Sequence, residues 1–128
     1  MAVRFLSEDF MVEGTTLLND TEAVRTAVRG VEVAVQFDVT EAPDGDFSYH
    51  IKVADGRVDV ALGALADANA TMRSTYATTA RLARRELSNQ KAFLTGKVKF
   101  SGNLGAVMKN GTTLDLIQQT LGSMDVDY

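Results

Sequence analysis

The stretch Asn89-Gln-Lys-Ala-Phe-Leu-Thr-Gly-Lys-Val-Lys-Phe-Ser-Gly-Asn-Leu-Gly-Ala-Val-Met-Lys109 combines three structural signals. Its helical beginning is expected to end at Gly96, because glycine commonly terminates a helix. Polar and apolar residues then alternate, which predicts a strand with Val98 and Phe100 facing inward. Asn103 is a preferred N-cap residue, so another helix is predicted after the strand. This succession of helix, strand and helix indicates a mixed α and β protein.

Two longer strands are predicted upstream of this stretch by a strict alternation of residue types. Every odd-numbered residue from 31 to 39 is apolar or aromatic, and so is every odd-numbered residue from 47 to 53. A period of two is typical of a strand with one buried face. The intervening residues 41–46 contain a proline and a glycine, which favours a turn. The two strands are therefore expected to form a hairpin.

A third and a fourth strand are predicted next along the chain. The pair Asp55-Gly56 suits a tight type I′ turn, after which the alternation continues over residues 58–62. This third strand extends the hairpin into an antiparallel meander. Residues 68–74 predict a weaker fourth strand, with Ala70 and Met72 on its buried side.

Two helices are predicted before the first strand. Ser7 is a preferred N-cap residue and is followed by two acidic residues, which favours a helix start at this point. This helix is expected to end near Asn19. A second, shorter helix is predicted to begin at Thr21 and to end at Gly30.

Further helices are predicted in the second half of the chain. Ser74 or Thr75 is expected to cap a helix whose apolar stripe continues to Leu87. Near the C-terminus, Asn110-Gly111 interrupts the helical pattern, so a separate last helix is expected after it. The alternation of these elements favours an α+β fold with about five strands.

The stretch from Asn89 to Lys109 resembles the sterol-carrier-protein-2 (SCP2) family. That family typically has Asn-Pro-Gln, Ala-Phe, Gly-Lys, an alternating strand, Gly-Asn or Gly-Asp, and then an apolar helix. Of these features, this chain lacks only the proline after Asn89. Residues 53–60 and 67–72 are similar to upstream parts of the family, and residues 5–9 to the start of stand-alone bacterial members. The resemblance therefore extends over most of the chain.

The resemblance implies one SCP2-like domain over residues 1–128. Its fold would be α+β, with about five strands in a mostly antiparallel, twisted sheet covered by helices and an apolar cavity between sheet and helices. The implied function is non-catalytic binding, and in addition transfer, of a fatty acid, an acyl-CoA, a sterol-like molecule or another lipid. No cofactor is implied, and the oligomeric state is left open.

The cavity is expected between the inner face of the sheet and the last helix, where two apolar stripes would face each other. The alternative is that the same side chains only pack together as core. The predicted cavity residues, all apolar, are Ile51, Val60, Met72, Phe93, Phe100, Leu104, Val107, Met108, Leu114, Ile117 and Leu121.

Three arginines, Arg81, Arg84 and Arg85, have the spacing that would gather them on one face of the predicted helix. The net charge of the chain is −4, yet residues 68–128 contain four acids and eight bases. A cluster of guanidinium groups suits an anionic head group or transient contact with an anionic membrane surface. The alternative is a solvated helix face.

The composition favours a globular chain without disulfides. Of the 128 residues, 45% are hydrophobic, one is proline and none is cysteine. A signal peptide and a run of roughly 20 apolar residues are both missing from the sequence. We therefore expect a soluble, cytoplasmic protein. Gly102-Asn-Leu-Gly105 has the spacing of a nucleic-acid-binding loop, but it follows a strand in an acidic chain, so no nucleic-acid partner is predicted.

Catalytic chemistry has few candidate residues. His50 is the single histidine, and the alternation of its strand turns it toward solvent. One histidine without cysteines does not build a typical zinc site, so no metal site is predicted. Two alternatives stay open: a small hydratase, isomerase or hydrolase that uses the cavity, and a lipid-presenting partner of a lipid-metabolising enzyme.

Overall fold

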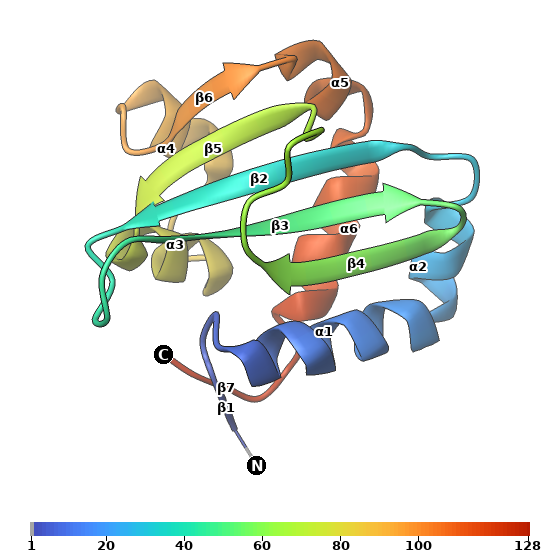
Figure 1. Cartoon of the computed structure of the whole chain (residues 1–128), viewed down its shortest axis with the longest axis horizontal. Coiled ribbons are helices and arrows are strands. Elements are labelled where there is room, and N and C mark those ends of the chain that lie inside the picture. The colour runs from blue at the N-terminus through green and yellow to red at the C-terminus, as the bar shows by residue number, and fades with distance from the viewer. Residues whose placement is uncertain (1) are drawn as a thin grey trace.

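A five-stranded sheet forms the centre of the computed structural model, which describes residues 2–128 (Figure 1). The strand order is β4-β3-β2-β5-β6. Only the β2–β5 pair is parallel, so the sheet is mostly antiparallel, as predicted. The strands are β2 (Val33–Thr40), β3 (Phe47–Ala54), β4 (Arg57–Leu62), β5 (Ala70–Thr75) and β6 (Lys99–Gly102).

The predicted meander is confirmed by the register of its strands. Val35 lies opposite Ile51, and Phe37 lies opposite Tyr49, so the alternating apolar residues of β2 and β3 share one face. The turn between β3 and β4 places Asp55-Gly56 at φ values of 54° and 73°, which a type I′ turn requires. The periodicity of two therefore predicts both the pairing and the buried face.

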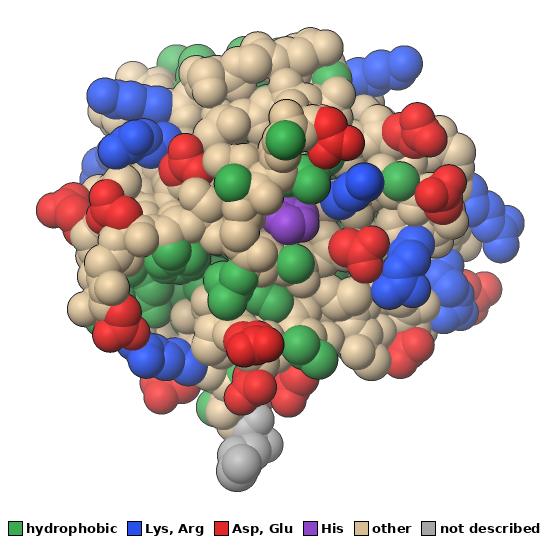
Figure 2. Space-filling view, viewed as in Figure 1, with side chains coloured by type: hydrophobic (Ala, Val, Ile, Leu, Met, Phe, Trp, Pro, Cys, Tyr) green, Lys and Arg blue, Asp and Glu red, His purple; other side chains and the backbone are tan. Residues whose placement is uncertain are grey.

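Helices cover one face of the sheet (Figure 1). The other face is crossed by the connection between β4 and β5 (Figure 1), and polar, charged and some apolar side chains surround the histidine there (Figure 2). His50 accordingly lies on the outward face, where its Nδ1 is 2.9 Å from the carbonyl oxygen of Gly63. The helices are α1 (Glu8–Asp20), α2 (Glu22–Ala27), α3 (Tyr76–Ala83), α4 (Asn89–Leu94), α5 (Leu104–Lys109) and α6 (Gly111–Leu121).

The predicted N-caps of α1, α3 and α5 are present. The Ser7 hydroxyl accepts from the amide of Phe10 at 3.2 Å, and the Thr75 hydroxyl accepts from the amide of Thr78 at 3.1 Å. The Asn103 side chain accepts from the amide of Ala106 at 3.1 Å. Each cap satisfies a backbone donor that the first helical turn leaves free.

Helix α1 seals the edge of the sheet at β4. The Thr15 hydroxyl accepts from the amide of Val60 and donates to its carbonyl, both at 3.0 Å. The side-chain amide of Asn19 accepts a hydrogen bond from the backbone amide of Val58 at 3.0 Å and donates one to the carbonyl of Val58 at 2.8 Å. These bonds replace the missing neighbour strand, because an edge strand otherwise presents unpaired backbone groups.

Helix α1 also packs closely against α6. A Cβ atom placed on Gly14 would lie 2.7 Å from Cδ2 of Leu121, so a larger residue would require the Leu121 side chain to move. Ile117 of α6 is completely buried in the same core. The absence of a side chain at Gly14 therefore leaves room beside α1 for the Leu121 side chain of α6.

The prediction that α3 continues to Leu87 is wrong. The helix ends at Ala83, and Arg85 has a φ of 62°. The amide of Glu86 donates a hydrogen bond to the carbonyl of Arg81 at 2.9 Å, and the amide of Arg85 donates one to the carbonyl of Leu82 at 3.2 Å. These two bonds define a Schellman motif with an arginine where glycine is usual.

A second, two-stranded sheet joins the two ends of the described chain. Strand β1 (Val3–Arg4) pairs in parallel with β7 (Val126–Asp127). Beside the paired residues, the amide of Phe5 bonds the carbonyl of Asp127 at 2.9 Å. This pairing brings Phe5 next to Tyr128, whose ring centroids lie 4.8 Å apart.

Candidate functional site

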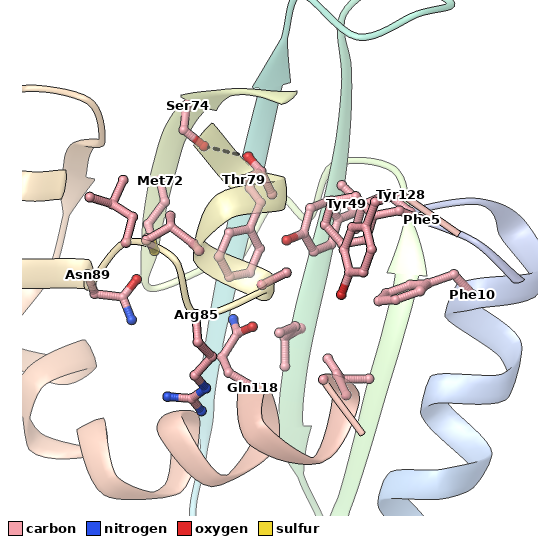
Figure 3. Close-up of a pocket in the computed structure, with 18 of the residues that line it drawn as sticks. Phe5, Phe10, Tyr49, Met72, Ser74, Thr79, Arg85, Asn89, Gln118 and Tyr128 are labelled. Atoms are coloured by element: carbon pink, nitrogen blue, oxygen red, sulfur yellow. Dashed lines mark hydrogen bonds between the residues drawn. The ribbon is translucent and has the colours of Figure 1, made fainter. Parts of the chain in front are cut away.

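A pocket of about 350 Å³ lies beneath the sheet. It is bounded by the inner face of β2, β3 and β5, by the helices α3 and α6, by the starts of α1 and α4, and by the paired ends of the chain (Figure 3). This volume is at the lower end of the range that small-molecule sites occupy.

Aromatic rings form much of the apolar wall. Phe37 and Tyr49 stack across β2 and β3 with a centroid distance of 4.7 Å and an interplanar angle of 10°. Phe5 contacts both Phe10, at 5.5 Å, and Tyr128, at 4.8 Å. The other apolar lining residues are Leu6, Ile51, Met72, Leu82, Ala83, Leu87 and Leu121.

Polar side chains gather at the other end of the pocket. Arg85, Asn89 and Gln118 lie together where the segment after α3 approaches α6, away from Phe5 and Phe10 (Figure 3). The pocket is therefore amphipathic, with one apolar end and one hydrogen-bonding end. The polar lining side chains are Ser74, Thr79, Arg85, Ser88, Asn89, Asp115 and Gln118.

Arg85 is the one cationic side chain among the residues that line this pocket. The Schellman motif directs it to this position. Its Nη1 lies 3.9 Å from Oδ1 of Asp115, too far for a hydrogen bond, while Oδ2 of Asp115 accepts from Gln119 at 2.9 Å. The guanidinium is thus only loosely held and has donors available for a ligand.

Tyr49 adds a neutral polar group to the apolar wall. Burial raises the pKa of its hydroxyl well above the ordinary value of 10.0, because the phenolate would lose its solvation. Among residues 2–128 every fully enclosed side-chain polar atom has a hydrogen-bond partner. Tyr49 is also one of the residues that line the pocket.

Three of the predicted cavity residues, Ile51, Met72 and Leu121, line the pocket. Val60 and Ile117 are instead buried in the core beside α1 and α6, and Met108 is 72% exposed. The remaining predicted residues lie outside the lining, at partly buried or exposed positions: Phe93, Phe100, Leu104, Val107 and Leu114.

The three predicted arginines do not share one helix face, because α3 ends before two of them. Arg81 lies within α3. Arg84 pairs with Glu86 at 3.0 Å and lies over the ring of Tyr128, 5.3 Å from its centroid. Arg85 lines the pocket. The three guanidinium groups therefore do not share one helix face, although Arg84 and Arg85 both line a second hollow beside α6 and Tyr128.

For several lining residues, the sequence pattern predicts that they are buried but not that they line a pocket. Phe37 and Tyr49 belong to the inward alternation of β2 and β3, which marks burial but not proximity to a cavity. Phe5 and Tyr128 have no signal, since they meet through two strands of two residues each. Such short strands have no measurable periodicity.

The architecture is that of a small α+β domain with a pocket between a sheet and one layer of helices. Within that class the chain belongs to the SCP-2 sterol transfer family, whose profile matches residues 15–115. Members of this family are in general lipid-binding or lipid-transfer domains. No curated protein sequence matches the chain.

Solved structures of similar fold support the assignment. Sterol carrier protein 2 from Yarrowia lipolytica, in its apo form, has a TM-score of 0.68 and 19% identity, over 90% of this chain and 88% of that one. A conserved hypothetical protein of Thermus thermophilus has a TM-score of 0.76 and 16% identity, over 99% and 94%. Sterol carrier protein domain 2 of Helicoverpa armigera has a TM-score of 0.65 and 26% identity, over 93% and 90%.

Two further properties concern residues 2–128. None of the helices in that range is both long and apolar enough to cross a membrane. The same residues contain no group of three or more histidine, cysteine, aspartate or glutamate side chains placed to hold a metal ion.

Proposed function

We propose that the chain reversibly binds a single-chain lipid in the pocket beneath β2, β3 and β5, and delivers it without a covalent step. The observation that carries this proposal is the separation of the lining into an apolar end, with Phe5 and Phe10, and a polar end, with Arg85 and Gln118. A hydrocarbon chain would occupy the first end, and its head group the second.

The energetics favour a ligand with a hydrocarbon chain. Each methylene transferred from water into the pocket contributes about 0.8 kcal/mol. Association itself costs several kcal/mol in lost freedom of motion. A ligand with several buried methylenes therefore binds, whereas the polar head group contributes mainly selectivity.

The groups in the pocket support binding rather than turnover. The hydroxyls of Ser74 and Thr79 hydrogen-bond to each other at 2.8 Å, and Thr79 also donates to the carbonyl of Thr75 at 2.8 Å. Both hydroxyls are thus engaged within the protein. His50, the single histidine, lies on the opposite face of the sheet and is no general base for this pocket.

We assign the head-group contact to Arg85 among the three arginines. A carboxylate or phosphate accepts two parallel hydrogen bonds from a guanidinium, and these bonds are stronger than those between neutral groups. Arg85 is the lining cation and is 3.9 Å from its acidic neighbour. An anionic head group would therefore displace a weak contact.

Blocking the pocket tests the binding proposal. Ala83→Trp adds a large side chain at the lining, and Ala77→Trp makes the same change at an exposed position of α3. Titration with a fluorescent fatty acid and native mass spectrometry of the purified protein are the measurements. We expect Ala83→Trp to lose bound lipid and Ala77→Trp to keep it. Equal binding by the two folded variants would contradict the proposal.

Head-group selectivity is tested by Arg85→Gln, with Arg81→Gln as the matched control outside the pocket. Loss of a charge-assisted hydrogen bond costs about 1.5–3 kcal/mol, so the affinity of Arg85→Gln for a fatty acid should fall roughly tenfold or more. Its affinity for the corresponding fatty alcohol should change little. If both variants bind both ligands like the unchanged protein, Arg85 does not contact the head group.

A further inference from the structure

Large apolar side chains are exposed at the β6 edge of the sheet. Phe93 is 47% exposed and Leu94 73% exposed, both on α4, and Met108 on α5 is 72% exposed. The two helices precede and follow β6, the outermost strand on this side. Exposed apolar side chains that gather on one surface commonly mark a contact site.

The same edge is basic in an acidic protein. Residues 87–114 contain four lysines and no acid, although the whole chain has a net charge of −4. Among residues 2–128, the ion pairs involve only arginines, so these lysines have no acidic partner there. The four exposed lysines are Lys91, Lys97, Lys99 and Lys109.

The arrangement is visible on the surface. Apolar side chains project along the β6 edge, at the top of the view, with Lys or Arg side chains toward both of its ends (Figure 2). Phe93 is held in place from below by Phe100, whose ring centroid is 5.3 Å away at an angle of 63°. This contact orders the Phe93 ring at the edge.

We propose that this α4–β6–α5 edge docks on a lipid bilayer of net negative charge. Separate apolar side chains on two short helices suit partial insertion between head groups, because each needs only a few ångströms of depth. The lysines would keep their ammonium groups at the phosphates while their hydrocarbon stems lie along the apolar surface. The proposal does not depend on the ligand of the pocket.

The position of the edge gives docking a consequence. Ser88 and Asn89, at the start of α4, line the polar end of the pocket. Docking through α4 would bring this end close to the bilayer surface. Arg84, in contrast, has the carboxylate of Glu86 at 3.0 Å, which weakens its attraction to an anionic surface.

Vesicle flotation tests the proposal with two kinds of variant. In the first, Lys91, Lys97 and Lys99 are changed to glutamine. In the second, Leu94→Ser is combined with Met108→Ser. The matched control, Val12→Ser, removes an apolar side chain that is 61% exposed on α1, among acidic residues. Vesicles of phosphatidylcholine alone are compared with vesicles that also contain phosphatidylserine, at low and raised salt.

Binding of the unchanged protein should need phosphatidylserine and weaken with salt. Because each lysine near an anionic surface contributes about one kcal/mol, the triple lysine variant should lose roughly a hundredfold in vesicle affinity. The Leu94 and Met108 variant should lose binding even at low salt, and Val12→Ser should not. Circular dichroism checks that each variant is folded.

Three outcomes would overturn the proposal. The first is absence of binding to either kind of vesicle by the unchanged protein. The second is an equal loss in Val12→Ser and in the edge variants. The third is dimerisation through this edge in place of membrane docking. In that case the unchanged protein sediments as a dimer and does not bind vesicles, and the Leu94 and Met108 variant sediments as a monomer.

Discussion

The inner face of the sheet has two halves with different packing. In the packed half, beneath α1, Val53 and Val58 are almost completely buried, and the backbone of β4 is bonded to Thr15 and Asn19. In the pocket half, beneath α3, Met72 and Ser74 are only partly buried and line an open volume. Side chains alternate between the two faces in both halves, although the inward positions of β5 include the polar Ser74.

The difference shows that the length and course of the covering helix determine where a cavity forms. Helix α1 has 13 residues and follows the β4 edge, so its side chains fill the space below. Helix α3 has 8 residues and ends in the Schellman motif at Arg85. The chain then continues to α4, and the space over Met72 stays open.

The largest expected effect comes from the same substitution in each half. Leu18→Ala removes a completely buried side chain of α1 and should lower the free energy of unfolding by about 2–5 kcal/mol, because a cavity remains. Leu82→Ala, at the pocket lining, should cost roughly 1 kcal/mol or less, since open volume already adjoins it. Urea unfolding measures both. Equal losses would show that the halves are packed alike.

The seal of the β4 edge gives the second prediction. Thr15→Val keeps the shape of the side chain but leaves the amide and carbonyl of Val60 without their partner, which should cost about 1–3 kcal/mol. Thr16→Val is the control at an exposed position of the same helix. Faster hydrogen exchange at the Val60 amide should accompany the loss. Unchanged exchange in Thr15→Val would mean that α1 does not protect this edge.

Tyr49 gives a pH-dependent prediction for the pocket half. Its pKa in the folded protein is raised above the ordinary 10.0, so above that pH the unfolded chain releases a proton that the folded protein keeps. The stabilisation is thus fully present below pH 10.0 and is lost as the pH rises, by at most about 1.4 kcal/mol per pH unit. Tyr49→Phe should lack this loss when unfolding is compared near pH 9 and about pH 11. If the free energy of unfolding falls equally in the unchanged protein and in Tyr49→Phe, the Tyr49 hydroxyl is exposed to solvent in the folded protein.

The smallest expected effect concerns the outward face. His50→Ala removes a side chain that contacts Gly63 on the face opposite the pocket, so ligand affinity should stay within about twofold of the original. Isothermal titration with a fatty acid provides the measurement. A large loss of affinity, or of any activity found for the protein, would favour the enzymatic alternative.

Local signals predicted most elements of the fold. Alternation predicted β2, β3 and β4 together with their antiparallel pairing, and capping residues such as Ser7 and Asn103 predicted helix starts. The parallel pairing of β5 with β2 was not predictable from these signals. Alternation indicates which side chains face inward but not which strand becomes the neighbour.

The candidate site was less predictable because a cavity depends on what lies opposite each side chain. Val60 and Ile51 have the same pattern in their strands, yet Val60 packs in the core beside α1 and Ile51 lines the pocket. The end of α3 also lacked a signal, since Arg85 takes the left-handed conformation where a glycine would have indicated a helix end. The position of Arg85 at the pocket was therefore not predictable from the local sequence.

If the proposed function is right, the hydrocarbon chain of a bound lipid lies in the pocket half of the molecule. Intermolecular nuclear Overhauser effects between a fatty acid labelled along its chain and the protein's methyl groups test it directly. We expect contacts from the chain to Ile51, Met72 and Leu121, and none to Val60. A bound fatty acid whose chain contacts only exposed methyl groups, such as that of Met108, would contradict it.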